Sequence, residues 1–354
     1  MAPLNLAVVG LGRIGVIHAF HANELALENA GCRLAALVDI DAERAERLAA
    51  DLETTDVQIF STVEDALASG QIDAAVIATP TGLHQLHAEQ FIQAGKRVLL
   101  EKPMTSSLQD DRAFAARLDK DAPNALMLAF QRRFDAPLQH AKRLLDDGAI
   151  GRVFKIVSIL EDSGPLPDGY DSPGLLTDMS VHNIDEILWL LGKTPLRAAA
   201  LGDRLYSHRL TTANEDFDDG LICLWFEGEL AGQVQVSRNH RPGYRVETWV
   251  FGEEGIIHVG HFEQRRFEVV VEAYGPEKTI EKQTYPMRNY GGPMPEFVDR
   301  FGEAYKAELK EFVERCVLGA PFTVTHRNGL AAMEVIDAAN RGAFTREAGA
   351  PITT

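Results

Sequence analysis

The chain has 354 residues, of which 45% are hydrophobic and 25% charged, an ordinary globular composition with enough residues for two cores. A disordered tail protein and a small disulfide-stapled scaffold are therefore excluded. The formal net charge of −17 repels nucleic-acid phosphates and anionic membrane surfaces, so we expect neither as a partner.

The first part of the chain alternates short apolar runs with helix-like stretches, the pattern of βαβ units and a parallel sheet. The predicted strands are LNLAVVG, CRLAALVDI, VQIF, DAAVIAT, KRVLLEK and ALMLAF. The predicted helices span residues 16–29, 41–52, 62–68, 84–94 and 108–118. Gly31, Gly70 and Gly95 are expected to follow helix ends, and Ser61 with Glu64 to open a helix as a capping box.

Beyond Gly151 longer strands follow one another, as in an antiparallel sheet. They are RVFKIVSIL, DGLICLWFE, LAGQVQVSRN, YRVETWVFG, GIIHVGH and RRFEVVVEAYG. The accompanying helices are predicted over 175–191, 295–318 and 327–343. We therefore expect an α/β fold with a doubly wound parallel sheet in residues 1–129, followed by an α+β domain on a largely antiparallel sheet in residues 130–354.

The three cysteines, Cys32, Cys223 and Cys316, lie far apart and form no CxxC pair. They indicate neither a disulfide framework nor a zinc site, and we expect reduced thiols in a cytoplasmic protein. The apolar run at the N-terminus is too short and has no basic flank, so a signal peptide and a membrane span are not expected.

The run GLGRIG at residues 10–15 follows a predicted strand and opens a predicted helix, the context of a Rossmann dinucleotide-binding fingerprint. Its first glycine permits a tight turn, its second lets a pyrophosphate approach the backbone, and its third lets the helix pack on the strand. The helix N-terminus then offers N–H groups and a positive dipole end to the phosphates. The candidate cofactor contacts in this loop are Gly10, Gly12, Arg13 and Ile14.

Asp39 ends the second predicted strand, where a carboxylate accepts hydrogen bonds from the adenosine ribose and repels a 2′-phosphate. Ile40 follows it and provides no cationic partner for such a phosphate. We therefore predict NAD rather than NADP, with both residues beside the cofactor. The alternative is that Asp39 is a solvated cap of the helix over 41–52.

Further motifs stand in a fixed order along the chain. They are ATPTGLH at 78–84, EKP at 101–103, FQRRFD at 130–135, DMSVHNID at 178–185 and RFGEAYKAEL at 300–309. Together with the glycine loop they resemble the Gfo/Idh/MocA oxidoreductase family over nearly the whole chain, and its inositol 2-dehydrogenase branch in particular. The resemblance implies an NAD-binding Rossmann domain, a substrate-binding and oligomerisation domain, and a homotetramer or homodimer.

The residue types in two of these motifs suit the oxidation of an alcohol, which needs a base for the hydroxyl proton. Asp178, His182 and Asp185 are spaced i, i+4 and i+7, so a helix presents them on one face. Lys102 ends a predicted strand at the carboxyl edge of the sheet, where its ammonium can hydrogen-bond the reacting oxygen. The alternatives are a satisfied or surface histidine at 182 and a solvated lysine at 102.

The resemblance implies that Lys102, Asp178 and His182 are the catalytic set. His182 would be the general acid/base, Lys102 would orient the hydroxyl, and Asp178 would assist the proton relay. The sequence leaves open whether the imidazole or the lysine carries the proton.

The resemblance also implies secondary contacts. Those to the cofactor are Thr79, Pro80, His84, Glu101 and Lys102, although Thr81 stands where many members have Asn. Those to the substrate are Lys102, Arg132, Asp178, His182, Asp185 and Tyr290. For three of them a structural role is also open: a surface salt bridge from Arg132 to Asp135, a helix-surface position for Asp185, and local packing for Tyr290.

A pair of histidines and one long loop give weaker indications of function. His18 and His21 are three residues apart on the first predicted helix, but without a third ligand we expect surface histidines and no metal. The loop over 161–175 is rich in Pro, Gly and Asp, and forms either a pocket wall or a connector.

The leading hypothesis is an NAD-dependent oxidoreductase acting on a secondary hydroxyl of a cyclic polyol or sugar, with myo- or scyllo-inositol converted to its keto form. An aldose or other sugar dehydrogenase of the same family is the first alternative. A glycosidase that retains its NAD and a non-catalytic NAD-binding protein are the others.

Overall fold

The computed structural model describes residues 2–54, 56–164, 173–205, 217–260, 267–291 and 295–343. The chain forms two compact units, Met1–Phe134 with Gly302–Leu330 and Asp135–Phe301 with Ala331–Thr354. The stretch Gly302–Leu330, placed in the second domain by the sequence analysis, thus belongs to the first unit. Its apolar side chains join a buried cluster of that unit, where Leu309 and Phe312 pack with the core that contains Leu6.

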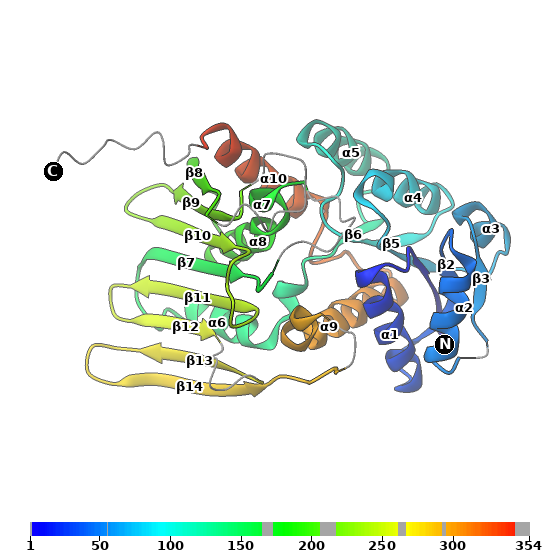
Figure 1. The fold of residues 1–354 in the computed structure, drawn as a ribbon, viewed down its shortest axis with the longest axis horizontal. Helices are drawn as coiled ribbons and strands as arrows, with labels where there is room; N and C mark the ends of the chain where they lie inside the picture. The colour runs from blue at the N-terminus through cyan, green and yellow to red at the C-terminus, as the bar shows by residue number, and fades with distance from the viewer. Residues whose placement is uncertain are drawn as a thin grey trace. The chain divides into compact units, whose positions relative to one another are not determined.

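The first unit is built on a six-stranded sheet in the order β3-β2-β1-β4-β5-β6 (Figure 1). Its strands are β1 Leu4–Val9, β2 Cys32–Val38, β3 Gln58–Phe60, β4 Ala74–Ile77, β5 Arg97–Leu100 and β6 Leu126–Leu128. In the described residues each neighbouring pair is parallel. The strand order reverses between β1 and β4, and ligands of open α/β sheets bind at the carboxyl ends of such neighbours.

Helices connect the strands of this sheet: α1 Arg13–Leu27, α2 Ala42–Asp51, α3 Val63–Ala68, α4 Thr81–Gln93 and α5 Leu108–Asp121. Gly31, Gly70 and Gly95 have φ of +84°, +67° and +74°, as expected for residues that follow helix ends. The predicted capping box is wrong by one residue. Thr62 is the N-cap of α3, and its hydroxyl accepts the N–H of Asp65 at 3.1 Å, because Thr62 has the extended backbone that a cap requires.

The second unit contains an eight-stranded sheet in the order β14-β13-β12-β11-β7-β10-β9-β8. The strands are β7 Val153–Glu161, β8 Arg197–Asp203, β9 Asp219–Trp225, β10 Ala231–Ser237, β11 Arg245–Gly252, β12 Ile256–Gly260, β13 Glu268–Tyr274 and β14 Thr279–Pro286. Strands β7 and β10 pair in parallel, whereas the other described pairs are antiparallel. The sequence analysis missed the two edge strands. Strand β14 is mostly polar and exposed, so it has no alternating apolar signal.

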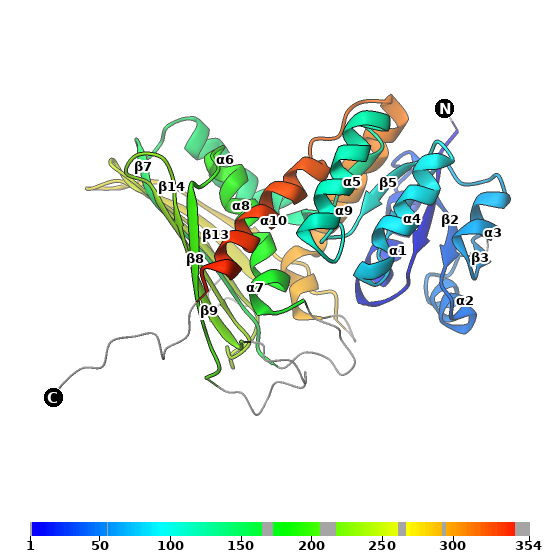
Figure 2. The ribbon, with the colours of Figure 1, turned by 90° about the horizontal axis from the view of Figure 1, so that it is seen from above.

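Helices α6 Ala136–Asp146, α7 Leu175–Asp178 and α8 Ser180–Leu191 belong to the second unit. Figure 2 shows α6 and α8 on one face of its sheet, and no described helix of this unit on the other. The predicted continuous helix over 175–191 is wrong, because it breaks at Met179. The hydroxyl of Ser180 donates to the carbonyl of Leu176, a back-bond that bends helices.

The short helix η1 Gln131–Phe134 closes the first stretch of the first unit. Helices α9 Glu296–Leu318 and α10 His326–Arg341 each contribute residues to both units. None of the described helices meets the length and hydropathy that a membrane crossing requires.

Candidate functional site

The glycine loop between β1 and α1 has three glycines with different structural demands. Gly10 has φ of +84°, and a Cβ there would lie 2.7 Å from the backbone nitrogen of Thr79. A Cβ on Gly15 would lie 1.7 Å from the carbonyl oxygen of Gly10. A Cβ on Gly12 would meet nothing within 4 Å. The first and third glycines are therefore required by the fold, while the second leaves open space beside the backbone, which fits a dinucleotide pyrophosphate.

The N-terminus of α1 faces this open space. Its N-cap is Gly12, with no side-chain hydrogen bond to the first turn. Arg13 is exposed and Ile14 is half-buried. Backbone N–H groups and the helix dipole thus remain for an anion, so the residues present fit the phosphates of NAD.

Asp39 lies at the end of β2, nearly buried at 8% exposure. Its Oδ2 accepts the N–H of Leu11 at 2.7 Å, and its Oδ1 accepts the N–H of Asp41 at 2.9 Å. The alternative interpretation as the cap of α2 is wrong, because Asp41 is that cap and accepts the N–H of Arg44 at 3.0 Å. Ile40 is 92% exposed.

Sequence analysis did not anticipate a cation beside Asp39. The Arg44 Nη1 atom lies 3.6 Å from the Oδ2 atom of Asp39. Arg44 is at the i+3 position from the cap Asp41 in the first turn of α2, but nothing in the sequence around it distinguishes it from the other arginines of that helix.

The EKP motif follows β5 at the carboxyl edge of the parallel sheet. Glu101 is buried, and its Oε1 lies 2.8 Å from the Nε2 of His18. Its Oε2 accepts the backbone N–H of Lys102 at 3.3 Å. Lys102 itself is half-buried, and the hydrogen bond of its backbone N–H to the buried Glu101 helps to define the backbone position of the lysine.

The expectation of surface histidines on α1 is wrong, since His18 and His21 are both fully buried. His18 pairs with Glu101 and meets the Tyr305 ring edge to face at 5.7 Å. His21 lies 3.2 Å from Glu24. Helical spacing shows that the two histidines share a face, but the partners of His18, Glu101 and Tyr305, come from distant segments. In the described residues no group of His, Cys, Asp or Glu is arranged to hold a metal ion.

His84 connects two loops at the same sheet edge. Its Nδ1 lies 2.7 Å from the Pro103 carbonyl and its Nε2 lies 2.8 Å from the Thr79 carbonyl. Burial lowers the pKa of His84. Both ring nitrogens contact backbone carbonyls, so His84 has a structural role: it joins the Thr79 turn to the EKP loop. Pro80 is exposed and immediately precedes α4.

In the second unit the break at Met179 separates two predicted catalytic residues. Asp178 ends α7 with 13% of its side chain exposed. His182 is half-buried in the first turn of α8, and Asp185 is fully buried one turn later. Arg238, which follows β10, places its Nη2 atom 3.5 Å from the Oδ2 of Asp178. Sequence reasoning missed Arg238, because a basic residue after a strand is common.

A buried polar network fixes helix α8 to the sheet. Glu186 is fully buried and accepts hydrogen bonds from Ser158 at 3.1 Å and from Thr248. Asn183 donates to the Ser158 hydroxyl at 2.7 Å. These contacts join α8 to β7 and β11, so the helix that carries His182 has a defined rotation.

Arg132 is 1% exposed, which rules out the surface position considered for it. Its supposed partner, Asp135, instead forms a bidentate pair with Arg300, at 2.7 Å and 2.9 Å. Asp135 also caps α6 through the N–H of Leu138 at 3.3 Å. The proposed salt bridge between Arg132 and Asp135 is therefore not the arrangement that the structure shows.

Tyr290 is half-buried in the turn before α9. Its N–H donates to Asp299 at 2.9 Å, and the Arg288 guanidinium lies 4.6 Å from the centre of its ring. Most of the Pro/Gly/Asp loop considered as a pocket wall, residues 165–172, lies outside the described residues.

The predicted residues thus gather in two places, one in each unit. In the first unit the glycine loop, Asp39, Thr79, His84, Glu101 and Lys102 lie at the carboxyl edge of the parallel sheet. In the second unit Asp178, His182 and Asp185 lie on α7 and α8, with Arg238 beside them.

Family models match both parts of the chain. The model of an oxidoreductase family with an NAD-binding Rossmann fold matches residues 4–129, and that of the GFO/IDH/MocA C-terminal domain matches residues 138–258.

Relatives match most of the chain. It is 31% identical over 315 residues to the scyllo-inositol 2-dehydrogenase (NAD(+)) of Bacillus subtilis, covering 88% of this chain and 85% of that protein. It is 30% identical over 340 residues to the inositol 2-dehydrogenase of Rhizobium meliloti, covering 96% of each.

A solved structure shares the fold over almost the full length. The scyllo-inositol dehydrogenase of Lactobacillus casei, with bound NAD(H) and scyllo-inositol, has a TM-score of 0.77 and 26% identity, covering 96% of this chain and 97% of that chain. The glycine loop, the buried EKP motif and these matches agree. The chain belongs to the Gfo/Idh/MocA family, and it is an NAD-dependent oxidoreductase of the type that acts on CH–OH groups.

Proposed function

We propose that this enzyme oxidises a secondary hydroxyl of a cyclic polyol, with myo- or scyllo-inositol as the substrate and the corresponding keto compound as the product. The observation that carries the proposal is the half-buried His182 in the first turn of α8, with the fully buried Asp185 one turn later and Asp178 at the end of the preceding helix α7. Carboxylates beside an imidazole suit proton transfer from a hydroxyl, and hydroxyl-rich rings need such acceptors. The names of the two relatives at about 30% identity support the same substrate class.

His182, Lys102 and Asp178 have distinct roles in the proposed reaction. His182 takes the hydroxyl proton as general base, and Asp178 stabilises the imidazolium that results. Lys102 orients the hydroxyl and stabilises the charge that develops on its oxygen. Bound NAD supplies the acceptor for the hydride.

The cofactor contacts are part of the proposal. Gly10, Gly12, Arg13 and Ile14 hold the phosphates, Asp39 holds the adenosine ribose with Ile40 beside it, and Thr79, Pro80, Glu101 and Lys102 lie at the nicotinamide end. His84 contributes by positioning the Thr79 and Pro103 carbonyls. Substrate hydroxyls contact Arg132, Asp185 and Tyr290 in addition to the catalytic set.

The test is a panel of inositols and aldoses assayed at 340 nm with NAD and with NADP. We expect the highest kcat/KM with an inositol and NAD. A clear preference for an aldose would show that the substrate is a sugar and not an inositol. Turnover of a glycoside without net NADH would instead identify an NAD-retaining glycosidase, and the absence of any turnover with tight NAD binding would identify a non-catalytic protein.

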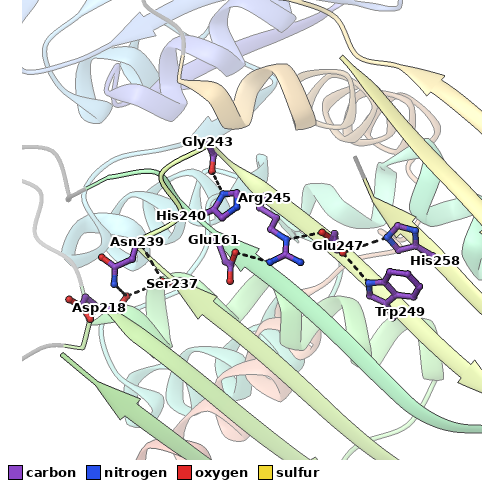
Figure 3. Close-up of polar contacts among 10 residues, drawn as sticks. All are labelled: Glu161, Asp218, Ser237, Asn239, His240, Gly243, Arg245, Glu247, Trp249 and His258. Carbon is purple, nitrogen blue, oxygen red and sulfur yellow. Dashed lines mark hydrogen bonds and ion pairs between the residues drawn. The ribbon is translucent and has the colours of Figure 1, made fainter. Parts of the chain in front are cut away.

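We also propose that the uncovered face of the second sheet pairs with a second copy of the chain, in a homodimer or homotetramer. This face presents aromatic rings: Trp249 is stacked on His258, with 3.8 Å between ring centres (Figure 3), and on Phe251, with 6.5 Å between ring centres. Burial alone raises the pKa of Glu247, but hydrogen bonds from His258, Arg245 and Trp249 lower it to about 2. The carboxylate of Glu247 on this face is thus paired with Arg245, which lowers the cost of covering it at an interface.

Analytical ultracentrifugation tests the assembly. We expect a dimer or tetramer that the Trp249→Lys substitution dissociates, and a monomeric wild-type enzyme would refute it. The proposed compartment is the cytoplasm, which suits Cys32, Cys223 and Cys316 as free thiols.

A further inference from the structure

A buried arginine lies against a carboxylate of the proposed catalytic set. The Nη2 of Arg238 is 3.5 Å from the Oδ2 of Asp178, and the side chains are 5% and 13% exposed. Moving a guanidinium out of water costs several kcal/mol unless a partner compensates for it. The motifs that identify the family include Asp178 and not Arg238, so neither motif nor spacing gives this arginine a role.

Three donors from Arg238 and its two chain neighbours share one acceptor, the carbonyl of Asp218, and Figure 3 draws the contacts of Ser237 and Asn239. The Ser237 hydroxyl at 3.5 Å, the Arg238 N–H at 2.9 Å and the Asn239 amide at 3.4 Å all donate to the carbonyl of Asp218. Asp218 is 1% exposed, and its own Oδ1 accepts the N–H of Leu205 at 2.7 Å. Arg238 therefore projects from a fixed segment.

His240, two residues after Arg238, is also held in place by hydrogen bonds. The His240 N–H donates to the carbonyl of Asp162 at 3.0 Å, and its Nδ1 lies 2.7 Å from the carbonyl of Gly243. Because β7 and β10 run in parallel, their carboxyl ends meet at one edge of the sheet, and Asp162 and Arg238 directly follow those ends. Helix α7, which bears Asp178, packs on β9 and β10. The position of Arg238 relative to Asp178 is thus set by the sheet.

We propose that Arg238 is a positioning residue for the proton-transfer step: it orients the Asp178 carboxylate and offsets its charge, so that His182 stays neutral and ready to accept a proton. The proposal rests on the proposed function. A carboxylate alone favours a protonated imidazole nearby, and an imidazolium is unable to act as a base. A permanently charged guanidinium on the same carboxylate opposes this effect.

Most of the other charged groups near this segment are acidic. On the elements packed around it the acidic groups are Glu161 on β7, Asp203 on β8, Asp218 just before β9, Asp219 at its start, and Asp185 and Glu186 on α8. The cations are Arg204, which follows β8, and Arg245 on β11, whose Nη1 lies 3.1 Å from the Oε2 of Glu161. Burial raises the pKa of Asp219. The removal of Arg238 leaves this acidic surrounding with one positive charge fewer, which stabilises an imidazolium at position 182.

The experiment compares Arg238→Gln and Arg238→Lys with the wild-type enzyme, using kcat/KM against pH for the best substrate of the panel. In R238Q we expect the acid limb of the profile to move up by about one pH unit, because Asp178, no longer offset by the guanidinium, then favours the imidazolium at position 182. On the acid limb, at pH values below both pKa values, its kcat/KM falls about tenfold, as a shift of one pH unit implies. The Kd for NAD stays within about twofold, and R238K restores most of the wild-type profile, because it keeps the charge.

A matched control separates this role from a structural one. Arg300 is also a buried arginine paired with an aspartate of the same unit, Asp135. Arg300→Gln should lower the Tm and leave the acid limb at its wild-type pH. If R238Q has an unchanged acid limb, or if R300Q moves it equally, the proposal is wrong. Should R238Q be insoluble, Arg238→Met, which keeps the length of the side chain, carries the same test.

Asp178→Asn distinguishes this failure from a failure of the proposed function. If D178N retains wild-type turnover, the catalytic assignment itself fails, and with it this proposal. If D178N is impaired while R238Q has a wild-type profile, only the role of Arg238 is refuted. If both are impaired and the double variant D178N/R238Q is no worse than D178N alone, the two residues act through one another.

Discussion

The Oδ2 atom of Asp39 accepts a hydrogen bond of 2.7 Å from the backbone N–H of Leu11. This contact joins the end of β2 to the glycine loop that follows β1. The carboxylate proposed to bind the adenosine ribose therefore also holds the loop proposed to bind the pyrophosphate. Cofactor selectivity and loop conformation depend on the same side chain.

We expect Asp39→Ala to lower kcat/KM for NAD by at least about tenfold, because hydrogen bonds to charged groups contribute roughly 1.5 to 3 kcal/mol each. We also expect the ratio of NADP to NAD activity to rise. The carboxylate that repels a 2′-phosphate is removed, and the guanidinium of Arg44, 3.6 Å from it, becomes available to that phosphate.

Steady-state kinetics with both cofactors check this, with the double variant D39A/R44A as the control. The double variant should lose the gain in NADP activity. An unchanged NADP to NAD ratio in D39A would remove Asp39 from the cofactor site.

The glycine loop allows folding and binding to be separated by two equivalent substitutions. Gly15→Ala should destabilise the fold severely, by more than about 3 kcal/mol, since its Cβ would overlap the Gly10 carbonyl oxygen at 1.7 Å. Gly12→Ala should change the free energy of unfolding by about 1 kcal/mol or less, because its Cβ meets nothing within 4 Å.

The same Gly12→Ala variant should weaken NAD binding at least about tenfold, since the methyl group occupies the space where a pyrophosphate approaches the backbone. Urea unfolding and titration calorimetry with NAD measure the two effects. Wild-type affinity in G12A would show that the phosphates bind elsewhere.

The proposed catalytic residues predict a loss of turnover without a loss of cofactor. Lys102→Ala and His182→Ala should each lower kcat by about 10²-fold or more, as expected for removal of a general base or of a charge-stabilising donor. The Kd for NAD should remain within a few fold, because the glycine loop and Asp39 are untouched. Near wild-type turnover in either variant would remove that residue from the catalytic set.

A buried carboxyl next to the EKP loop predicts a pH dependence of stability. Asp111 on α5 is fully buried, and its Oδ1 accepts the Thr105 hydroxyl at 2.7 Å. Burial raises the pKa of Asp111 to about 6 from its ordinary value of 3.8. Between about pH 4 and 6 the folded protein therefore keeps a proton that the unfolded chain has lost. The contribution of Asp111 to the free energy of unfolding falls by about 3 kcal/mol as the pH rises through this window.

Asp111→Asn should abolish this contribution. The free energy of unfolding of D111N minus that of the wild type should be larger at pH 8 than at pH 4, as measured by urea unfolding at both pH values. Asp121→Asn, an exposed position at the end of the same helix, should show no such difference. A difference between wild type and D111N that is the same at both pH values would contradict the raised pKa.

Local sequence patterns predicted much of the first unit. Continuous apolar runs marked β1, β2 and β4, because parallel strands are buried on both faces. Gly10, Gly12 and Gly15 lie within the short run 10–15, so their spacing alone predicts the dinucleotide-binding fingerprint. Strand β14 escaped prediction because an exposed edge strand carries no apolar alternation.

The site was predicted less completely. The motifs pointed to Lys102, Asp178 and His182, and helical spacing suggested one continuous helix through the last two. The break at Met179 depends on a side-chain to backbone bond at Ser180, which periodicity does not report.

The sequence by itself determined the family, the cofactor and the alternating strands and helices of the first unit, because these depend on motifs and periodicities within short stretches of the chain. Only the tertiary structure decided that His18 is buried against Glu101, and that Arg238 faces Asp178. It likewise decided that residues 302–330 complete the first core. Each of these pairings joins residues at least 60 positions apart. Hydrophobic periodicity shows which face of an element is buried, but the partner that covers this face is selected by packing and charge compensation in the folded chain.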